Sequence, residues 1–93
     1  MRFEWDPQKA ESNFKKHGVD FDLAMESFAD PLFREKLNRV VYGEERFIGF
    51  GMVAGHLLAV VFTSWDVYGE EVVRIISARA ANRAERRDHE GGT

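Results

Sequence analysis

The chain has 93 residues, a net charge of −3 and no cysteine. Its length allows one domain with a modest core, because domains typically hold ~100–150 residues. Hydrophobic residues make up 44% of the sequence and aromatic residues 13%, a composition that excludes an intrinsically disordered chain. The lack of cysteine excludes disulfides, thiolate nucleophiles and cysteine-bound metals.

No segment predicts a membrane span or a signal peptide. The longest apolar run, Leu57–Phe62, is far shorter than the ~20 residues that a membrane-spanning helix needs. No apolar run follows Arg2, as it would in a signal peptide. We therefore expect a cytoplasmic protein.

Charge is unevenly distributed along the chain. Residues 1–19 and 72–93 carry a net positive charge, whereas residues 20–71 carry a net negative charge. The negative total argues against a dedicated nucleic-acid binder, which usually has a basic surface. Any polyanion would therefore be met by the two ends of the chain.

The N-terminal segment predicts a short strand followed by a helix. Arg2–Trp5 alternates polar and apolar residues, the pattern of a half-buried strand. Asp6 is a good helix N-cap, and Pro7 suits the first helical position. The helix is expected to end at His17, because Gly18 fits the left-handed residue that follows many helices.

A second helix is expected to start after Asp20 and to stop at Asp30-Pro31. Its apolar residues recur at helical spacing, namely Phe21, Ala24, Met25 and Phe28. Residues 32–38 show no clear periodicity and are expected to form a loop.

From residue 39 onward the pattern becomes that of strands. The predicted strands are 39–42, 45–53, 56–63 and 72–77. Residues 65–71 are expected to form a loop. Ser77 is expected to cap an alanine-rich last helix that runs to about Arg87.

This order predicts an α+β fold in two layers, with two N-terminal helices packed on a mostly antiparallel sheet of four to five strands. A C-terminal helix completes it. Residues 1–90 are expected to form a single domain, and residues 91–93 a disordered tail.

No motif predicts a metal or a cofactor. The three histidines, His17, His56 and His89, lie far apart in the sequence. Gly49 and Gly51 lie within a predicted strand, where they indicate close packing or a bend rather than a nucleotide-binding loop.

The remaining chemistry is that of cations and proton exchange. Lys16 and His17 lie at a helix end, and Arg74 and Arg79 lie at and beyond the last strand. Cleavage of RNA by its own 2′-hydroxyl needs cations on the phosphate and groups that exchange protons. These residue types fit that reaction, but basic groups are also common at any helix C-terminus, and Arg74 fits a solvent-exposed strand face equally well.

Three further features have two interpretations each. Trp65 in a predicted loop could stack on a base, whereas Trp5 beside a helix cap fits the core better. Glu45-Arg46 fits a site or an exposed strand edge. The arginines of the predicted last helix fit a solvated helix face or a surface for an acidic partner; they are Arg83, Arg86 and Arg87.

Three short motifs carry a family resemblance. They are F-x-W-D-x-x-K at residues 3–9, N-x-x-K-H-G-V at 13–19 and R-I-I-S-A-R at 74–79. In this order and spacing the chain resembles the BrnT family of type II toxin–antitoxin toxins, from Phe3 to about Glu90.

The resemblance implies a RelE/ParE-like fold and a metal-independent ribonuclease without cofactor that inhibits translation by cutting RNA. It implies a BrnA-like ribbon-helix-helix antitoxin as partner, binding of operator DNA only through that antitoxin, and a heterotetramer as one expected assembly. The resemblance implies a catalytic set made of Lys16, His17, Arg46, Arg74 and Arg79. It implies that three other motif residues support the fold, namely Trp5, Asp6 and Lys9.

The chain departs from the family pattern at Phe62, Trp65 and His89, where many members have His, Arg and Tyr. The loss of a cation at position 65 removes one expected phosphate contact. The alternative hypothesis is a non-catalytic module that acts as a scaffold or corepressor for a small DNA-binding partner. A small hydrolase using His56 or His89 has no supporting set of residues.

Overall fold

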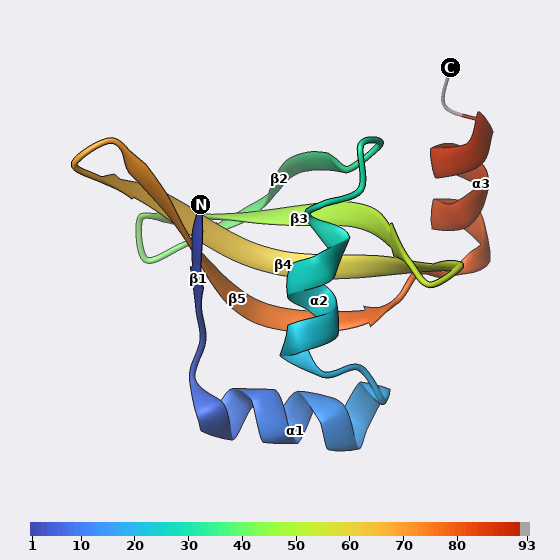
Figure 1. Cartoon of the computed structure of the whole chain (residues 1–93), viewed down its shortest axis with the longest axis horizontal. Coiled ribbons are helices and arrows are strands. Elements are labelled where there is room, and N and C mark those ends of the chain that lie inside the picture. The colour runs from blue at the N-terminus through green and yellow to red at the C-terminus, as the bar shows by residue number, and fades with distance from the viewer. Residues whose placement is uncertain (92–93) are drawn as a thin grey trace.

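A computed structural model describes residues 1–91 of the chain (Figure 1). The elements follow the predicted order of one strand, two helices, four strands and one helix. They are β1 Arg2–Glu4, α1 Pro7–His17, α2 Phe21–Ser27, β2 Arg34–Val41, β3 Glu44–Val53, β4 His56–Val67, β5 Glu70–Ala80 and α3 Arg83–Gly91. The predicted α+β class is confirmed. Of the tail expected at 91–93, Gly91 is the last residue of α3, and residues 92–93 lie outside the described part.

All five strands form one sheet in the order β1-β5-β4-β3-β2. β1 pairs with β5 in parallel, and the other pairs are antiparallel. Helices α1 and α2 lie on the same side of this sheet, and α3 stands apart at one end (Figure 1). The mostly antiparallel sheet is therefore confirmed, with five strands.

The two N-terminal helices begin and end as their capping residues predict. Asp6 accepts a hydrogen bond from the backbone N–H of Gln8 at 2.9 Å, and Asp20 accepts one from Leu23 at 2.8 Å. Gly18 follows α1 with a φ of 72°, a conformation that glycine adopts without strain.

The core lies between the sheet and α1 and α2. It is built from Val19, Phe21, Ala24, Val53, Leu58, Val60, Phe62, Val73, Ile75 and Ala78. One polar side chain also reaches into it: the Asn13 amide donates to the carbonyls of Val19 and Ala78 and accepts from the Ala78 N–H, at 2.9, 2.8 and 3.1 Å. Asn13, a member of the second family motif, thus joins α1 to β5.

Gly49 and Gly51 bring β3 close to the end of α2 and to the segment that follows it. A Cβ on Gly49 would collide with the Phe33 ring, and one on Gly51 would collide with the Ser27 carbonyl. The structure thus explains the two glycines by close packing, as the sequence indicates.

Two of the predicted loops are wrong, because both segments pair as strands. Residues 34–38 form the first half of β2, whose residues are nearly all exposed and so show no apolar periodicity. Residues 65–71 continue β4 and β5 around a two-residue turn at Tyr68-Gly69, with φ values of 50° and 86°.

The predicted start of the last helix is also wrong. Ser77, Ala78 and Ala80 belong to β5 and pair with β4, so sheet pairing overrides the helix propensity of alanine. The helix is capped instead by Asn82, whose side chain accepts from the Glu85 N–H at 2.8 Å.

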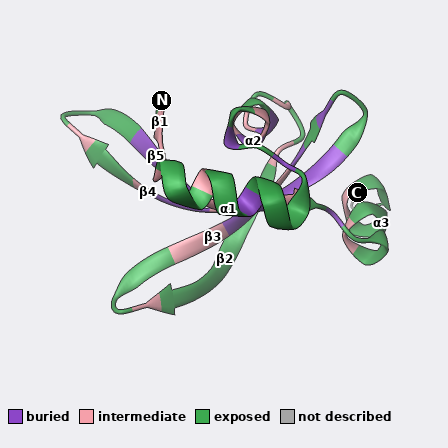
Figure 2. Cartoon of the chain, turned by 90° about the horizontal axis from the view of Figure 1, so that it is seen from below, coloured by how far each residue is buried: buried purple, intermediate pink, exposed green. Residues whose placement is uncertain are grey.

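Beyond the Phe47–Phe62 pair, β3 and β4 stop pairing. The ends of the β2–β3 and β4–β5 hairpins then diverge, and residues near both tips are exposed (Figure 2). The sheet therefore has a paired centre and two separate arms.

We expect Gly51→Ala to lower the free energy of unfolding by about 1–3 kcal/mol, because the added methyl meets backbone that cannot rotate away. Urea unfolding measures the change. Gly91→Ala is the control, since no atom lies within 4 Å of its added Cβ and its effect should stay within about 0.5 kcal/mol. Equal stability of Gly51→Ala and the wild type would contradict the proposed close packing.

Tyr68→Asn should raise the free energy of unfolding by about 0.5–1 kcal/mol. Tyr68 has a φ of 50°, where asparagine is far less strained, and its side chain is fully exposed, so no packing is lost. Thermal unfolding gives the comparison. A lower melting temperature for this variant would show that the tyrosine stabilises the turn.

Candidate active site

Strand alternation gives the sheet two different faces. Residues such as Val60 and Phe62 point toward α1 and α2 into the core. Their neighbours in sequence point to the other side, which we call the open face. The open face is where the structure gathers arginines and lysines.

The strand register aligns open-face residues in three rows across the sheet. The first two rows are Arg34, Phe50, Ala59 and Arg79, then Lys36, Ile48, Val61 and Ser77. The third row continues the register through the pairs Arg39–Arg46 and Thr63–Arg74. These rows hold six of the 13 lysines and arginines, so the strand register gathers cations on one face although the chain is acidic in total.

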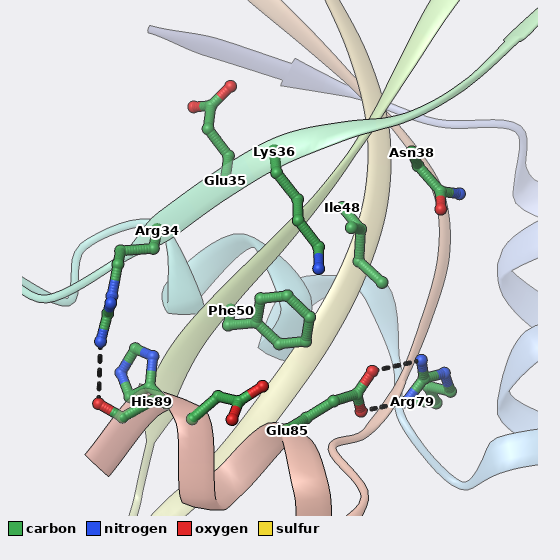
Figure 3. Close-up of a pocket in the computed structure, with 10 residues that line it drawn as sticks. Arg34, Glu35, Lys36, Asn38, Ile48, Phe50, Arg79, Glu85 and His89 are labelled. Carbon is green, nitrogen blue, oxygen red and sulfur yellow. Dashed lines mark hydrogen bonds and ion pairs between the residues drawn. The ribbon is translucent and has the colours of Figure 1, made fainter. Parts of the chain in front are cut away.

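A cleft of about 480 Å³ lies at the first two rows, where α3 approaches the open face (Figure 3). Its lining residues are Arg34, Glu35, Lys36, Asn38, Ile48, Phe50, Arg79, Glu85, Asp88 and His89. An apolar floor of Ile48 and Phe50 is thus surrounded by three cations, two carboxylates and one imidazole, while the Glu35 side chain points away from it (Figure 3).

The strongest contact in this cleft joins β5 to α3. Both terminal nitrogens of Arg79 donate to the Glu85 carboxylate, at 2.7 and 2.9 Å. The fork of a guanidinium fits a carboxylate or a phosphate in this two-point geometry. Glu85 also accepts from the Asn82 N–H at 2.9 Å, which completes a capping box at the start of α3.

The ion pair changes the titration of both partners. The hydrogen bonds from Arg79 lower the pKa of Glu85, although burial opposes them, and Lys36 adds a smaller lowering. The pKa of Arg79 is raised by the same hydrogen bonds. Glu85 is therefore an ionised carboxylate near neutral pH.

His89 supplies an imidazole at the opposite end of the cleft from Arg79 (Figure 3). Within residues 1–91, its Nε2 is the one buried side-chain nitrogen or oxygen atom that lacks a hydrogen-bond partner. The backbone carbonyl of His89 accepts from Arg34 at 2.9 Å. A buried imidazole nitrogen without a partner points to a group that exchanges a proton or binds a ligand.

The structure does not bring the five predicted site residues into one site. Arg79 lines the cleft, while Arg46 and Arg74 lie in the third row, paired with Glu44 at 3.3 Å and Glu4 at 2.9 Å. Lys16 and His17 are exposed at the end of α1, a helix on the other side of the sheet, and do not line the cleft.

Two of the three residues expected to support the fold have a visible structural contact. Trp5 packs edge-on against Phe21 with ring centroids 5.9 Å apart, and Asp6 caps α1. Lys9 is exposed on α1.

Sequence reasoning missed Arg34, Lys36, Glu85 and His89 as members of one cleft. Arg34 and Lys36 lie in the segment 32–38, for which the sequence predicts a loop. Glu85 and His89 lie on the last helix, whose predicted start is too early. The spacing Asn82-x-x-Glu85 is a capping-box signal that could have placed the helix start correctly.

Comparison with known families decides the kind of protein. The family described as "Ribonuclease toxin, BrnT, of type II toxin-antitoxin system" matches residues 5–85. The chain belongs to this BrnT family. It is a ribonuclease toxin, and its type II system implies an antitoxin as partner. A comparison with curated proteins gave no match.

The BrnT match ends at Glu85, so it covers Arg34, Lys36 and Arg79 but not Asp88 or His89. None of the helices in residues 1–91 is long and apolar enough to cross a membrane.

We expect the Arg79–Glu85 pair to stabilise this BrnT protein less as the pH falls. The pKa of Glu85 in the folded chain lies below its ordinary value of 4.5. The stabilisation is therefore complete above pH 4.5 and disappears as the pH drops through the lower, folded-state pKa. Urea unfolding of wild type and Glu85→Gln should differ most at neutral pH and converge in acid. A constant difference across this range would count against the ion pair.

Proposed function

We propose that this BrnT toxin cleaves RNA without a metal ion, in the cleft between α3 and the open face. The observation that carries the proposal is that Arg34, Lys36 and Arg79 line one cleft together with His89, whose Nε2 has no hydrogen-bond partner. Guanidinium and ammonium groups stabilise the charge of a phosphate that is under attack. An imidazole exchanges protons near neutral pH.

The proposed reaction transfers the phosphate to the adjacent ribose oxygen. Glu85, which is ionised, accepts the proton of the 2′-hydroxyl, and the 2′-oxygen forms a bond to phosphorus. The bond from phosphorus to the 5′-oxygen breaks, and protonated His89 donates the proton that this oxygen needs. The products are a 2′,3′-cyclic phosphate and a 5′-hydroxyl end.

Arg79 has a double task in this scheme. It holds Glu85 in place in the free protein, and its fork can accept two phosphate oxygens when RNA binds. Lys36, whose charge already acts on Glu85, adds a second cation that lines the cleft.

The partner is proposed to be a BrnA-like ribbon-helix-helix antitoxin, through which alone the toxin reaches operator DNA. A heterotetramer of two toxins and two antitoxins fits the two-fold symmetry of such DNA-binding proteins. The toxin would then act on RNA in the cytoplasm when it is free of its partner.

Purified toxin, freed of its antitoxin, should cleave a short RNA in EDTA and leave cyclic phosphate ends. Arg79→Ala should lower kcat/KM by about 100-fold or more, as expected for the loss of a group that stabilises a developing anion. His89→Ala should give a similar loss, while Glu85→Gln should remove the decline of the rate at acidic pH.

His56→Ala is the control, because His56 is exposed at the start of β4 and does not line the cleft. A loss of activity in His17→Ala but not in His89→Ala would move the reaction to the end of α1. Intact RNA under all conditions would reject the cleft as a catalytic site.

A further inference from the structure

We infer that single-stranded RNA continues beyond the cleft along the open face and that Trp65 stacks on one of its bases. This inference rests on the proposed function, because it extends the path of the same substrate. It assigns a binding role to Arg46, Arg74 and Trp65, which lie outside the cleft.

The geometry of the sheet supplies the path. Successive open-face residues on one strand are two residues apart, which separates neighbouring rows by about 7 Å. Arg79 and Arg34 lie in the first row, and Arg46 and Arg74 lie in the third. Cations therefore recur along the strands at intervals that a nucleic acid backbone can follow. Contacts from these cations to phosphates would be the main source of affinity for RNA.

The third row stays together although β3 and β4 stop pairing there. The Thr63 hydroxyl donates to the Glu45 carbonyl at 2.9 Å, which joins β4 to β3 at the point where the two arms separate. Thr63 pairs with Arg74, and Glu45 precedes Arg46 in the chain. The two arginines thus lie on either side of Thr63 and can hold the same stretch of backbone.

The partners of these arginines are easily exchanged. Arg46, itself 22% exposed, is paired with Glu44, and Arg74 is paired with Glu4; the two glutamate side chains are 47% and 39% exposed. Such surface pairs typically contribute only about 0–1 kcal/mol, so a phosphate can replace the carboxylate.

Trp65 provides the surface for a base one row farther along. It pairs with Val72, which is fully buried, while Trp65 itself is 41% exposed. A large indole on an open sheet face, one row beyond Arg74, has the form of the aromatic platforms on which unpaired bases stack. A base in a duplex has no free face, so the path is suited to single strands.

Cleavage of a dinucleotide and of a ten-nucleotide RNA separates this path from the cleft. Wild type should prefer the longer RNA, and Trp65→Ala should reduce that preference in kcat/KM about tenfold, as expected for one lost stacking contact. Tyr68→Ala is the matched control, because Tyr68 is an exposed aromatic at the tip of the same hairpin, beyond the rows. Its preference should equal that of wild type.

Salt dependence tests the two arginines independently. The logarithm of the affinity for a 2′-O-methyl ten-nucleotide RNA should fall less steeply with the logarithm of salt in Arg46→Ala and in Arg74→Ala, by about 0.7 in each variant for one lost phosphate contact. A variant that merely loses stability would keep the slope, and thermal unfolding reports its stability.

The outcomes distinguish the two proposals. If wild type cleaves RNA but Trp65→Ala keeps the full length preference, the path is wrong and the cleft stands. If wild type cleaves no RNA but binds the ten-nucleotide strand with a loss in Trp65→Ala, the path stands and the catalytic proposal fails. Equal affinity and equal salt slope in all variants would overturn the path.

Discussion

The ion pair between Arg79 and Glu85 is the contact on which the cleft depends. Helix α3 buries none of its residues, so apolar packing contributes little to its position. The two bonds between these side chains, together with the Arg34–His89 carbonyl bond, hold the helix against the open face. Without them His89 would have no fixed place opposite the cations. One charged contact thus closes the cleft and orients its proton-exchanging groups.

The alternation of side chains along four strands explains how an acidic chain gathers six cations on one face. One side of the sheet receives the apolar residues that α1 and α2 cover, and the other receives most of the strand arginines and Lys36. A shift of one residue in register would exchange the two sets and bury the charges. The Asn13 bonds to Ala78, which fix α1 on β5, thus also help to keep the cations on the open side.

Much of the fold could be predicted, because the signals were local. Asp6, Asp20 and Gly18 marked helix ends by side-chain and backbone chemistry that acts within a few residues. The first half of β2 could not be read in the same way, since its exposed residues show no apolar periodicity and form a strand only by pairing with β3. The start of α3 was misplaced because sheet pairing holds Ser77 to Ala80 in β5, although Asn82 and Glu85 offered a local capping signal. The candidate site was predicted least well, because Arg34, Arg79 and His89 line one cleft only after the strands have paired. Of the residues proposed from the sequence, only Arg79 lies in the cleft.

The closed cleft has a consequence for binding. Glu85 occupies the fork of Arg79 in the geometry that a phosphate would take, so an incoming RNA competes with the protein's own carboxylate. Because the lowered pKa keeps Glu85 ionised near neutral pH, protonation does not release it there. Release requires a stronger anion or a movement of α3, which polar contacts hold rather than a buried apolar face. RNA held by Arg46 and Arg74 on the open face would raise the local concentration of phosphate beside Arg79. Binding along the extended path would therefore help the RNA to displace Glu85 from Arg79.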